Sequence, residues 1–212
     1  MSLLCNMSIF VLMVLPVVLL AKGHHMIPQR ILPLIGVVAS CLLLESTIIA
    51  SLGGPGLLKL LQHSVCVLAL PVMDTAVLNF VLNDPKARRA LHVANGGDDA
   101  GAVVAVAWAT ADIVLFRWFR WYNVMQEPSF DQENLISAAE AFVNLVSLLL
   151  AARLIAVRAD SKANNNNGNS RSVAVAGARV VAAAVAVFYQ SHLLGGVAQL
   201  AILAALRGVL PH

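Results

Sequence analysis

The chain contains 212 residues, of which 59% are hydrophobic and only 12% are charged, and its mean hydropathy is +0.81. Soluble domains carry about 25% charged residues, so this composition excludes a water-soluble globular fold. The net charge of +3 is spread along the chain, which argues against a nucleic-acid interface. We therefore expect an all-α polytopic membrane protein in which seven transmembrane helices, joined by short loops, form one bundle.

Apolar segments of about 20 residues, the length needed to cross a bilayer, define the predicted helices in chain order. The first apolar segment lacks the positively charged start of a cleaved signal peptide, so we interpret it as a span. Pro71 is expected to kink the third span, because proline removes a backbone hydrogen bond. The predicted spans cover residues 3–21, 31–52, 60–82, 101–119, 135–157, 173–189 and 193–209.

Three connecting segments have distinct compositions. Residues 86–99 are polar and are expected to form a loop. Residues 160–171 include an Asn-rich tract that offers no apolar surface to bury, so we predict a disordered cytosolic loop there. Basic and aromatic residues end the fourth span, where they are expected to act as interface anchors at the lipid headgroups. These anchors are Arg117, Trp118, Arg120 and Trp121.

The distribution of Lys and Arg predicts the orientation of the bundle. One set of alternate loops and the tail carry Lys22, Arg30, Lys86, Arg88, Arg89, Arg153, Arg158, Lys162, Arg171 and Arg207, whereas the other loops carry Lys59, Arg117 and Arg120. Basic residues accumulate on the cytosolic side of membrane proteins. We therefore expect an external or lumenal amino terminus and a cytosolic carboxyl terminus.

Five ionisable residues fall within the predicted spans: Glu45, Asp74, Asp112, Glu140 and Arg179. A charge at the bilayer centre costs about 2.5–3.5 kcal/mol on insertion scales, so such residues face a bundle interior or a cavity. Three interpretations remain open at this point. The acids can pair with Arg179 or other polar groups and hold helices together, they can contact partner subunits, or they can form the path of a proton-coupled transporter.

Catalytic and metal-binding patterns are absent from the sequence. It has no H-E-x-x-H or G-x-S-x-G pattern, and its three cysteines show no C-x-x-C spacing. We therefore expect no enzyme activity, no metal and no cofactor. Trp108 and Asp112 are four residues apart and share one face of the fourth span. With neighbouring Thr110, they are candidates for helix packing or partner contact.

The stretch from Leu78 to Val143, about a third of the chain, resembles the transmembrane protein 147 family. The resemblance rests on Trp108-Ala109-Thr110-Ala111-Asp112, which is similar to that family's W-A-T-A followed by an acid in the fourth span. Further similarities follow in order along the chain: Asp74 with Leu78-Asn79, Phe130-Asp131, Glu140 and His192-Leu193. The Asn-rich tract has no counterpart in the family, and the first two spans are similar only in hydropathy.

The resemblance implies a specific cellular role. Members of that family reside in the endoplasmic reticulum membrane, where they join nicalin and the NOMO protein behind the Sec translocon. This assembly belongs to the multi-pass translocon and assists the insertion of multi-spanning proteins. By resemblance we expect a non-enzymatic scaffold subunit in the lipid bilayer. Its expected partners are nicalin-like and NOMO-like membrane proteins and the Sec translocon, and no small-molecule substrate is expected. The alternative is a small proton-coupled transporter that uses Asp74, Asp112 and Glu140.

Overall fold

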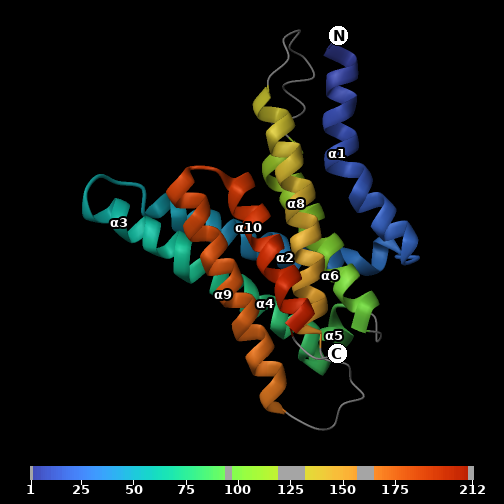
Figure 1. The fold of residues 1–212 in the computed structure, drawn as a ribbon. Helices are drawn as coiled ribbons and strands as arrows, with labels where there is room; N and C mark the ends of the chain where they lie inside the picture. Colours follow the sequence, from blue (N-terminus) through green and yellow to red (C-terminus); the bar gives the residue numbers. More distant parts are fainter. Residues whose placement is uncertain (1, 94–96, 119–131, 157–164, 210–212) are drawn as a thin grey trace.

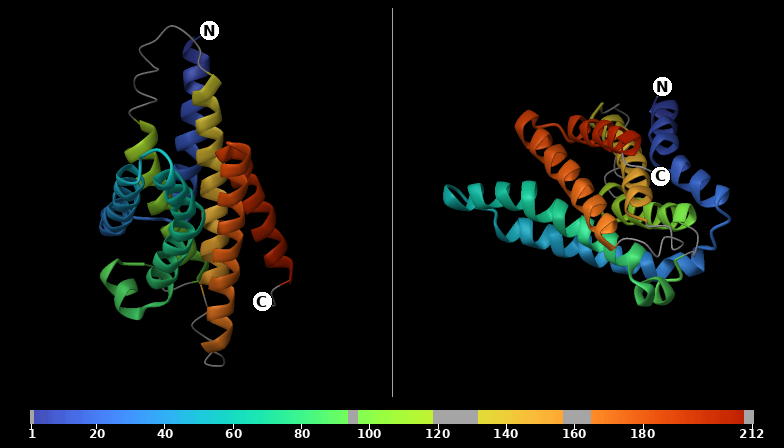
Figure 2. Two further views of the ribbon diagram at one scale, coloured as in Figure 1. Left: turned by 90° about the vertical axis from the view of Figure 1, so that its left-hand side faces the viewer. Right: turned by 60° about the horizontal axis from the view of Figure 1, so that its bottom comes forward.

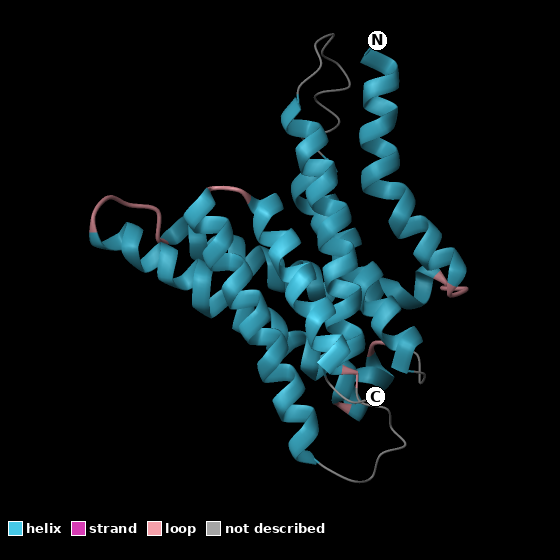
Figure 3. Cartoon of the chain, in the orientation of Figure 1, coloured by secondary structure: helices cyan, strands magenta, loops and turns pink. Residues whose placement is uncertain are grey.

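The computed structural model describes residues 2–93, 97–118, 132–156 and 165–209, and within them the chain is helical without strands (Figures 1 and 3). The helices are α1 Ser2–Gly23, α2 Pro28–Ser51, α3 Leu57–Ser64, η1 Val65–Ala69, α4 Leu70–Asn83, α5 Pro85–Ala90, α6 Gly97–Asp112, η2 Ile113–Arg117, α8 Gln132–Ile155, α9 Asn165–Tyr189 and α10 His192–Val209. Here η1 and η2 are π-helical turns.

Six helices in the described part of the chain are long and apolar enough to cross a membrane. They are Pro28–Ser51, Leu57–Asn83, Ala100–Arg117, Gln132–Ile155, Ser170–Tyr189 and His192–Val209, and Ser8–Gly23 of α1 forms a shorter apolar helix. Large apolar side chains such as Leu57, Phe188 and Val209 are exposed on their outer faces, as expected for surfaces that meet lipid. The protein is therefore an all-helical, multi-pass membrane protein.

The helix α6 forms the centre of the bundle. In its span, Ala100–Arg117, 67% of the residues are buried, whereas the figure is 11% for His192–Val209 of α10. The alanines of α6 are almost fully buried, and small side chains allow membrane helices to approach closely. α8, α2 and α1 pack against α6, and α9 and α10 pack against each other and against α8 (Figure 2).

The helix directions place several chain ends on one side of the molecule. The amino terminus of α1, the end of η2, the start of α8 and the short α9–α10 connection lie toward the top of Figure 1. The end of α8, the start of α9 and the described end of α10 lie toward the bottom (Figures 1 and 2). The helices α2 and α3–η1–α4 run obliquely across the others, with the α2–α3 turn projecting to the left of Figure 1.

Pro71 produces a local change of helix type rather than a sharp break. The π turn η1 ends at Ala69, two residues before Pro71 in the first turn of α4. A π turn absorbs a residue that the α-helical hydrogen-bond pattern cannot accommodate next to a proline. The Thr75 hydroxyl donates to the Pro71 carbonyl over 2.7 Å, so this buried turn keeps its polar groups satisfied.

Two predicted loops are partly helical. Residues 85–90 form α5, because the Asp84 side chain caps it by accepting hydrogen bonds from the Lys86 and Ala87 backbone amides. The backbone of α9 begins at Asn165, inside the segment 160–171 that the sequence predicts as a disordered loop. Asn and Ser favour helix starts because their side chains satisfy free amides, and the apolar run that follows propagates the helix. Residues 160–164 lie outside the described residues.

Candidate functional site

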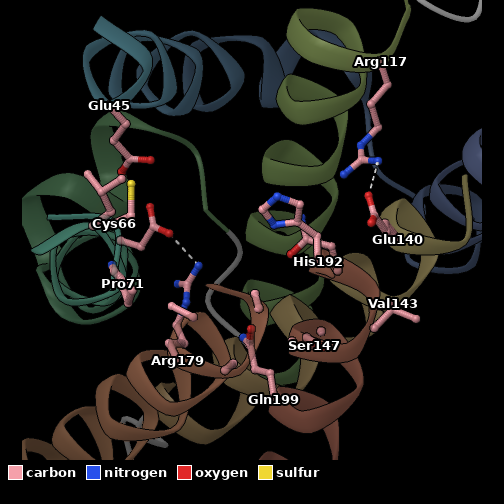
Figure 4. Close-up of a pocket in the computed structure, with 18 residues that line it drawn as sticks. Glu45, Cys66, Pro71, Arg117, Glu140, Val143, Ser147, Arg179, His192 and Gln199 are labelled. Atoms are coloured by element: carbon pink, nitrogen blue, oxygen red, sulfur yellow. Dashed lines mark hydrogen bonds and ion pairs between the residues drawn. The ribbon is translucent and has the colours of Figure 1, made fainter. Parts of the chain in front are cut away.

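A charged cavity of about 460 Å³ lies inside the bundle between α2, η1, α4, η2, α8, α9 and α10 (Figure 4). Cavities of a few hundred cubic ångströms are the usual size of small-molecule sites. Its polar and ionisable lining consists of Glu45, Cys66, Asp74, Arg117, Glu140, Asn144, Ser147, Arg179, His192 and Gln199. The structure thus brings four of the five predicted intramembrane charges to one place.

Helical periodicity explains how two helices present their polar side chains to this cavity. On α8, Glu140, Asn144 and Ser147 line it at positions i, i+4 and i+7, which share one helix face. On α10, His192 and Gln199 line it at i and i+7, with Gly195 and Gly196 between them. Each helix therefore carries a narrow polar stripe within an otherwise apolar surface.

Arg179 joins α9 to α4 through an ion pair with Asp74. The Arg179 Nη2 atom donates to Asp74 Oδ2 over 2.7 Å, across 105 positions of sequence. The guanidinium carbon also lies 6.0 Å from the ring centroid of Trp108, the distance at which an aromatic face attracts a cation. Arg179 is only 9% exposed, so its charge depends on these two neighbours.

Arg117 forms a second charged centre at the end of η2. Its Nε donates to Asp112 Oδ2 over 2.8 Å, and its Nη1 lies 3.6 Å from Glu140 Oε2. The same Nη1 donates to the carbonyl and the hydroxyl of Ser137. The guanidinium group of Arg117 thereby connects the end of the continuous helix α6–η2 to α8.

Arg117, predicted as an interface anchor, contacts interior acids. Its side chain is 17% exposed and contacts the carboxylates of Asp112 and Glu140. Trp118, by contrast, is 40% exposed, which is compatible with an anchor. Arg120 and Trp121 lie outside the described residues.

Three buried polar atoms of the cavity residues have no hydrogen-bond partner within the described chain. They are Asp74 Oδ1, Arg179 Nη1 and Ser147 Oγ. Buried polar groups are normally hydrogen-bonded, and an unsatisfied one costs about 1–3 kcal/mol. A monodentate ion pair between Arg179 and Asp74 explains two of these atoms, since each partner uses only one of its two terminal atoms. The cavity therefore presents a free acceptor and a free donor side by side.

Glu45 lines the cavity from α2, on the side of the Asp74–Arg179 pair (Figure 4). It is close enough to Asp74 for the two carboxyl groups to interact directly. Among the described residues, no arginine or lysine forms an ion pair with Glu45. Among the predicted intramembrane acids, Glu45 is therefore the one that makes no direct ion pair in the described structure, although Arg179 is close enough to act on it electrostatically.

Two predicted residues lie away from the cavity. Asn79 accepts a hydrogen bond from Asn83 Nδ2 over 2.6 Å, and the same nitrogen approaches the Ile155 carbonyl of α8 at 3.3 Å. The Thr110 hydroxyl donates to the Val106 carbonyl within α6. Asn79 hydrogen-bonds near the end of α4 and Thr110 hydrogen-bonds to the backbone of α6, and neither residue lines the charged cavity.

Sequence reasoning left out Asn144, Ser147 and Gln199 because each is uncharged and common in membrane helices. Their spacing from Glu140 and His192 carried the necessary signal, since the polar positions repeat with the helical period. No group of three or more His, Cys, Asp or Glu residues in the described chain is arranged to hold a metal ion. The chain matches no protein-family model, curated protein or solved structure.

Proposed function

We propose that this protein is a non-enzymatic scaffold subunit of a multi-pass translocon assembly in the endoplasmic reticulum membrane, where it assists insertion of multi-spanning proteins. The proposed partners are nicalin-like and NOMO-like membrane proteins and the Sec translocon. The proposal is supported by the resemblance of the Trp108–Asp112 segment to the transmembrane protein 147 family. The central position of that segment in α6 agrees with a role in holding the bundle together.

The observation that carries this proposal is the pairing of the intramembrane acids with arginines. Asp74 contacts Arg179, and Asp112 and Glu140 contact Arg117. Each pair joins two elements of the bundle or closes one helix end, so these charges act as fixed links between helices. A proton-coupled cycle instead requires carboxylates that exchange protons with water during each turnover.

The full proposal includes a seventh span and an orientation. The helix α1 has 22 residues and a length of about 33 Å at 1.5 Å per residue, enough for a hydrocarbon core of about 30 Å. One of its faces is buried at Ile9 and Met13, and the other exposes Val11, Leu15 and Leu19, as expected of a helix between bundle and lipid. With seven spans, the distribution of basic residues favours a lumenal amino terminus and a cytosolic carboxyl terminus.

Affinity purification tests the scaffold role. The full chain, tagged at its carboxyl terminus and extracted in mild detergent, is expected to recover nicalin-like, NOMO-like and Sec proteins in stable ratios. An unrelated seven-span protein of the same membrane, expressed at the same level, serves as the matched bait. Repeated recovery of the chain alone, or the same recovery with the unrelated bait, would contradict the proposal.

The second candidate is a small proton-coupled transporter, which the cavity favours because Asp74 and Glu140 both line it. It predicts that a pH gradient across reconstituted vesicles dissipates through the wild-type protein and not through Asp112→Asn. It also predicts that Cys66, which lines the cavity, reacts with small charged thiol reagents faster than Cys41, which does not line it. Equal gradients in empty and protein-containing vesicles would eliminate this candidate.

A further inference from the structure

The charged cavity contains more acidic than basic groups. Glu45, Asp74 and Glu140 line it, and Asp112 lies next to it on Arg117, whereas its arginines are Arg117 and Arg179. Together with His192, which also lines the cavity, these arginines make three basic groups beside four carboxyl groups. An unmatched carboxylate in a low-dielectric interior is costly. The cavity is therefore complementary to a positively charged group.

The free hydrogen-bonding atoms indicate where such a group would bind. Asp74 Oδ1 is buried and has no hydrogen-bond partner within the described chain, and Glu45, which makes no direct ion pair there, interacts with Asp74 and lines the cavity on the side of Arg179 (Figure 4). An ionised carboxylate accepts hydrogen bonds and donates none, so these oxygens match a cation that carries N–H groups. Arg179 Nη1, also free and belonging to a side chain only 9% exposed, can donate to an acceptor elsewhere in the same ligand.

The size of the cavity favours an organic cation over a metal ion as its ligand. A volume of about 460 Å³ greatly exceeds the space needed for a coordinated ion, and no metal-binding group is present among the described residues. The lining includes His192 at the start of α10 and Arg117 at the end of η2, both at the same end of the bundle. The cavity thus extends from the level of these helix ends inward to Asp74 and Arg179.

We propose that this cavity binds a primary ammonium group, with Glu45 and Asp74 accepting its N–H bonds and Arg179 donating to an acceptor of the same ligand. A primary ammonium supplies three donors, whereas a quaternary ammonium supplies none. Two sources carry this chemistry: the headgroup of an aminophospholipid and a free small amine. The inference rests on the cavity alone and does not depend on the translocon role.

Ligand-dependent stabilisation of the purified full-length chain in nanodiscs tests the proposal. In phosphatidylcholine nanodiscs at constant ionic strength, ethanolamine is expected to raise the unfolding temperature saturably, because binding to the folded state stabilises it. Tetramethylammonium and sodium at the same concentrations are expected to cause no rise. This comparison uses the wild-type chain and needs no variant.

The two sources give different results in the same assay. If an aminophospholipid is the ligand, phosphatidylethanolamine in the nanodisc raises the unfolding temperature without added amine and reduces the further response to ethanolamine. If a free amine is the ligand, the lipid composition leaves the ethanolamine response unchanged. Either result supports a primary-ammonium site. Absence of a response in both arms, or an equal response to tetramethylammonium, overturns it.

Variants of one residue locate the site. Glu45→Gln is expected to raise the half-saturating ethanolamine concentration about tenfold or more, the effect of losing a hydrogen bond to a charged group. Glu45→Asp retains the carboxylate and is expected to retain a saturable response. Glu133→Gln removes the same charge from an exposed position of α8 and is the matched control. An unchanged response in Glu45→Gln contradicts the proposed site.

Discussion

Asp74 and Arg179 stabilise each other in the interior, because each is the oppositely charged partner of the other. The cost of a charge in lipid was sufficient to predict that Asp74 and Arg179 face inward. Their contact across 105 positions depends on how α4 and α9 are rotated and placed, which no local pattern specifies. The sequence predicts Arg117 at the headgroups, although an arginine at a span end suits an interior acid equally well. Its contacts with Asp112 and Glu140 depend on the placement of η2 against α8.

Removing the guanidinium of Arg179 is expected to destabilise the protein strongly. Arg179→Ala leaves Asp74 as an unmatched charge in the interior, a change that costs about 3–5 kcal/mol in buried ion pairs. We expect a large fall in the unfolding temperature in detergent. Arg207→Ala, at an exposed position near the end of α10, is the matched control and is expected to have little effect.

A double-mutant cycle separates the ion pair from the packing of the Arg179 side chain. Asp74→Asn combined with Arg179→Ala removes both charges, and the double variant is expected to lose less stability than the sum of the two single variants. Additive effects would contradict direct coupling between the two residues.

Arg117→Lys is expected to destabilise the bundle although the charge is retained. The guanidinium contacts Asp112, Glu140 and Ser137 at once, and a single ammonium cannot reproduce that fork. The loss of one hydrogen bond to a charged group corresponds to about 1.5–3 kcal/mol. Thermal unfolding of Arg117→Lys and of exposed Arg30→Lys measures the difference, and equal unfolding temperatures would refute the bridging role.

At the level of helices, hydropathy located the described spans to within a few residues. The third predicted span, 60–82, corresponds to Leu57–Asn83, and the fifth, 135–157, corresponds to Gln132–Ile155. Hydropathy did not predict the π turns η1 and η2, because a π turn leaves the apolar composition unchanged. Both turns matter for the cavity, since Cys66 of η1 and Arg117 of η2 line it.

The crossing of α9 and α10 depends on the absence of a side chain at Gly195. A Cβ atom added there would lie 2.6 Å from Ala186 Cβ and 2.8 Å from the Ala182 carbonyl oxygen. We expect Gly195→Ala to destabilise the protein by about 1–3 kcal/mol, the usual cost of overpacking.

Gly208→Ala is the matched control for this prediction. It lies on the same helix, and nothing stands within 4 Å of its added Cβ. Alanine is the better helix former by about 1 kcal/mol, so this variant is expected to be neutral or stabilising. A comparison of the two unfolding temperatures decides the matter, and a stabilised Gly195→Ala would show that the helices are not in contact there.

The topology of the whole chain can be tested by glycosylation mapping. Seven spans place the two termini on opposite sides of the membrane, so an acceptor site added before α1 is expected to be glycosylated and one added after α10 is not. Two further sites serve as internal references. A site added in the α2–α3 turn is expected to be glycosylated, and a site added in residues 157–164 is not. Modification of both terminal sites would require an even number of crossings.

The cavity itself could not be predicted from the sequence. It forms because polar stripes on α8 and α10, a buried arginine of α9 and acids of α2 and α4 meet in one volume. Each stripe alone is compatible with a partner contact, a helix contact or a cavity. Only the three-dimensional arrangement of seven different helical segments distinguishes these outcomes, whereas the approximate limits of the six long apolar helices follow from the chain's local composition.

The sparse burial of α10 has a mechanical consequence. Only 11% of the residues in its span are buried, yet His192, Gly195, Gly196 and Gln199 close one wall of the cavity. The single helix α10 thus lies between the Asp74–Arg179 ion pair and the surroundings of the bundle on that side. A displacement of α10 by the surrounding bilayer or by an adjoining subunit would therefore move one wall of the cavity and change the spacing of its polar groups.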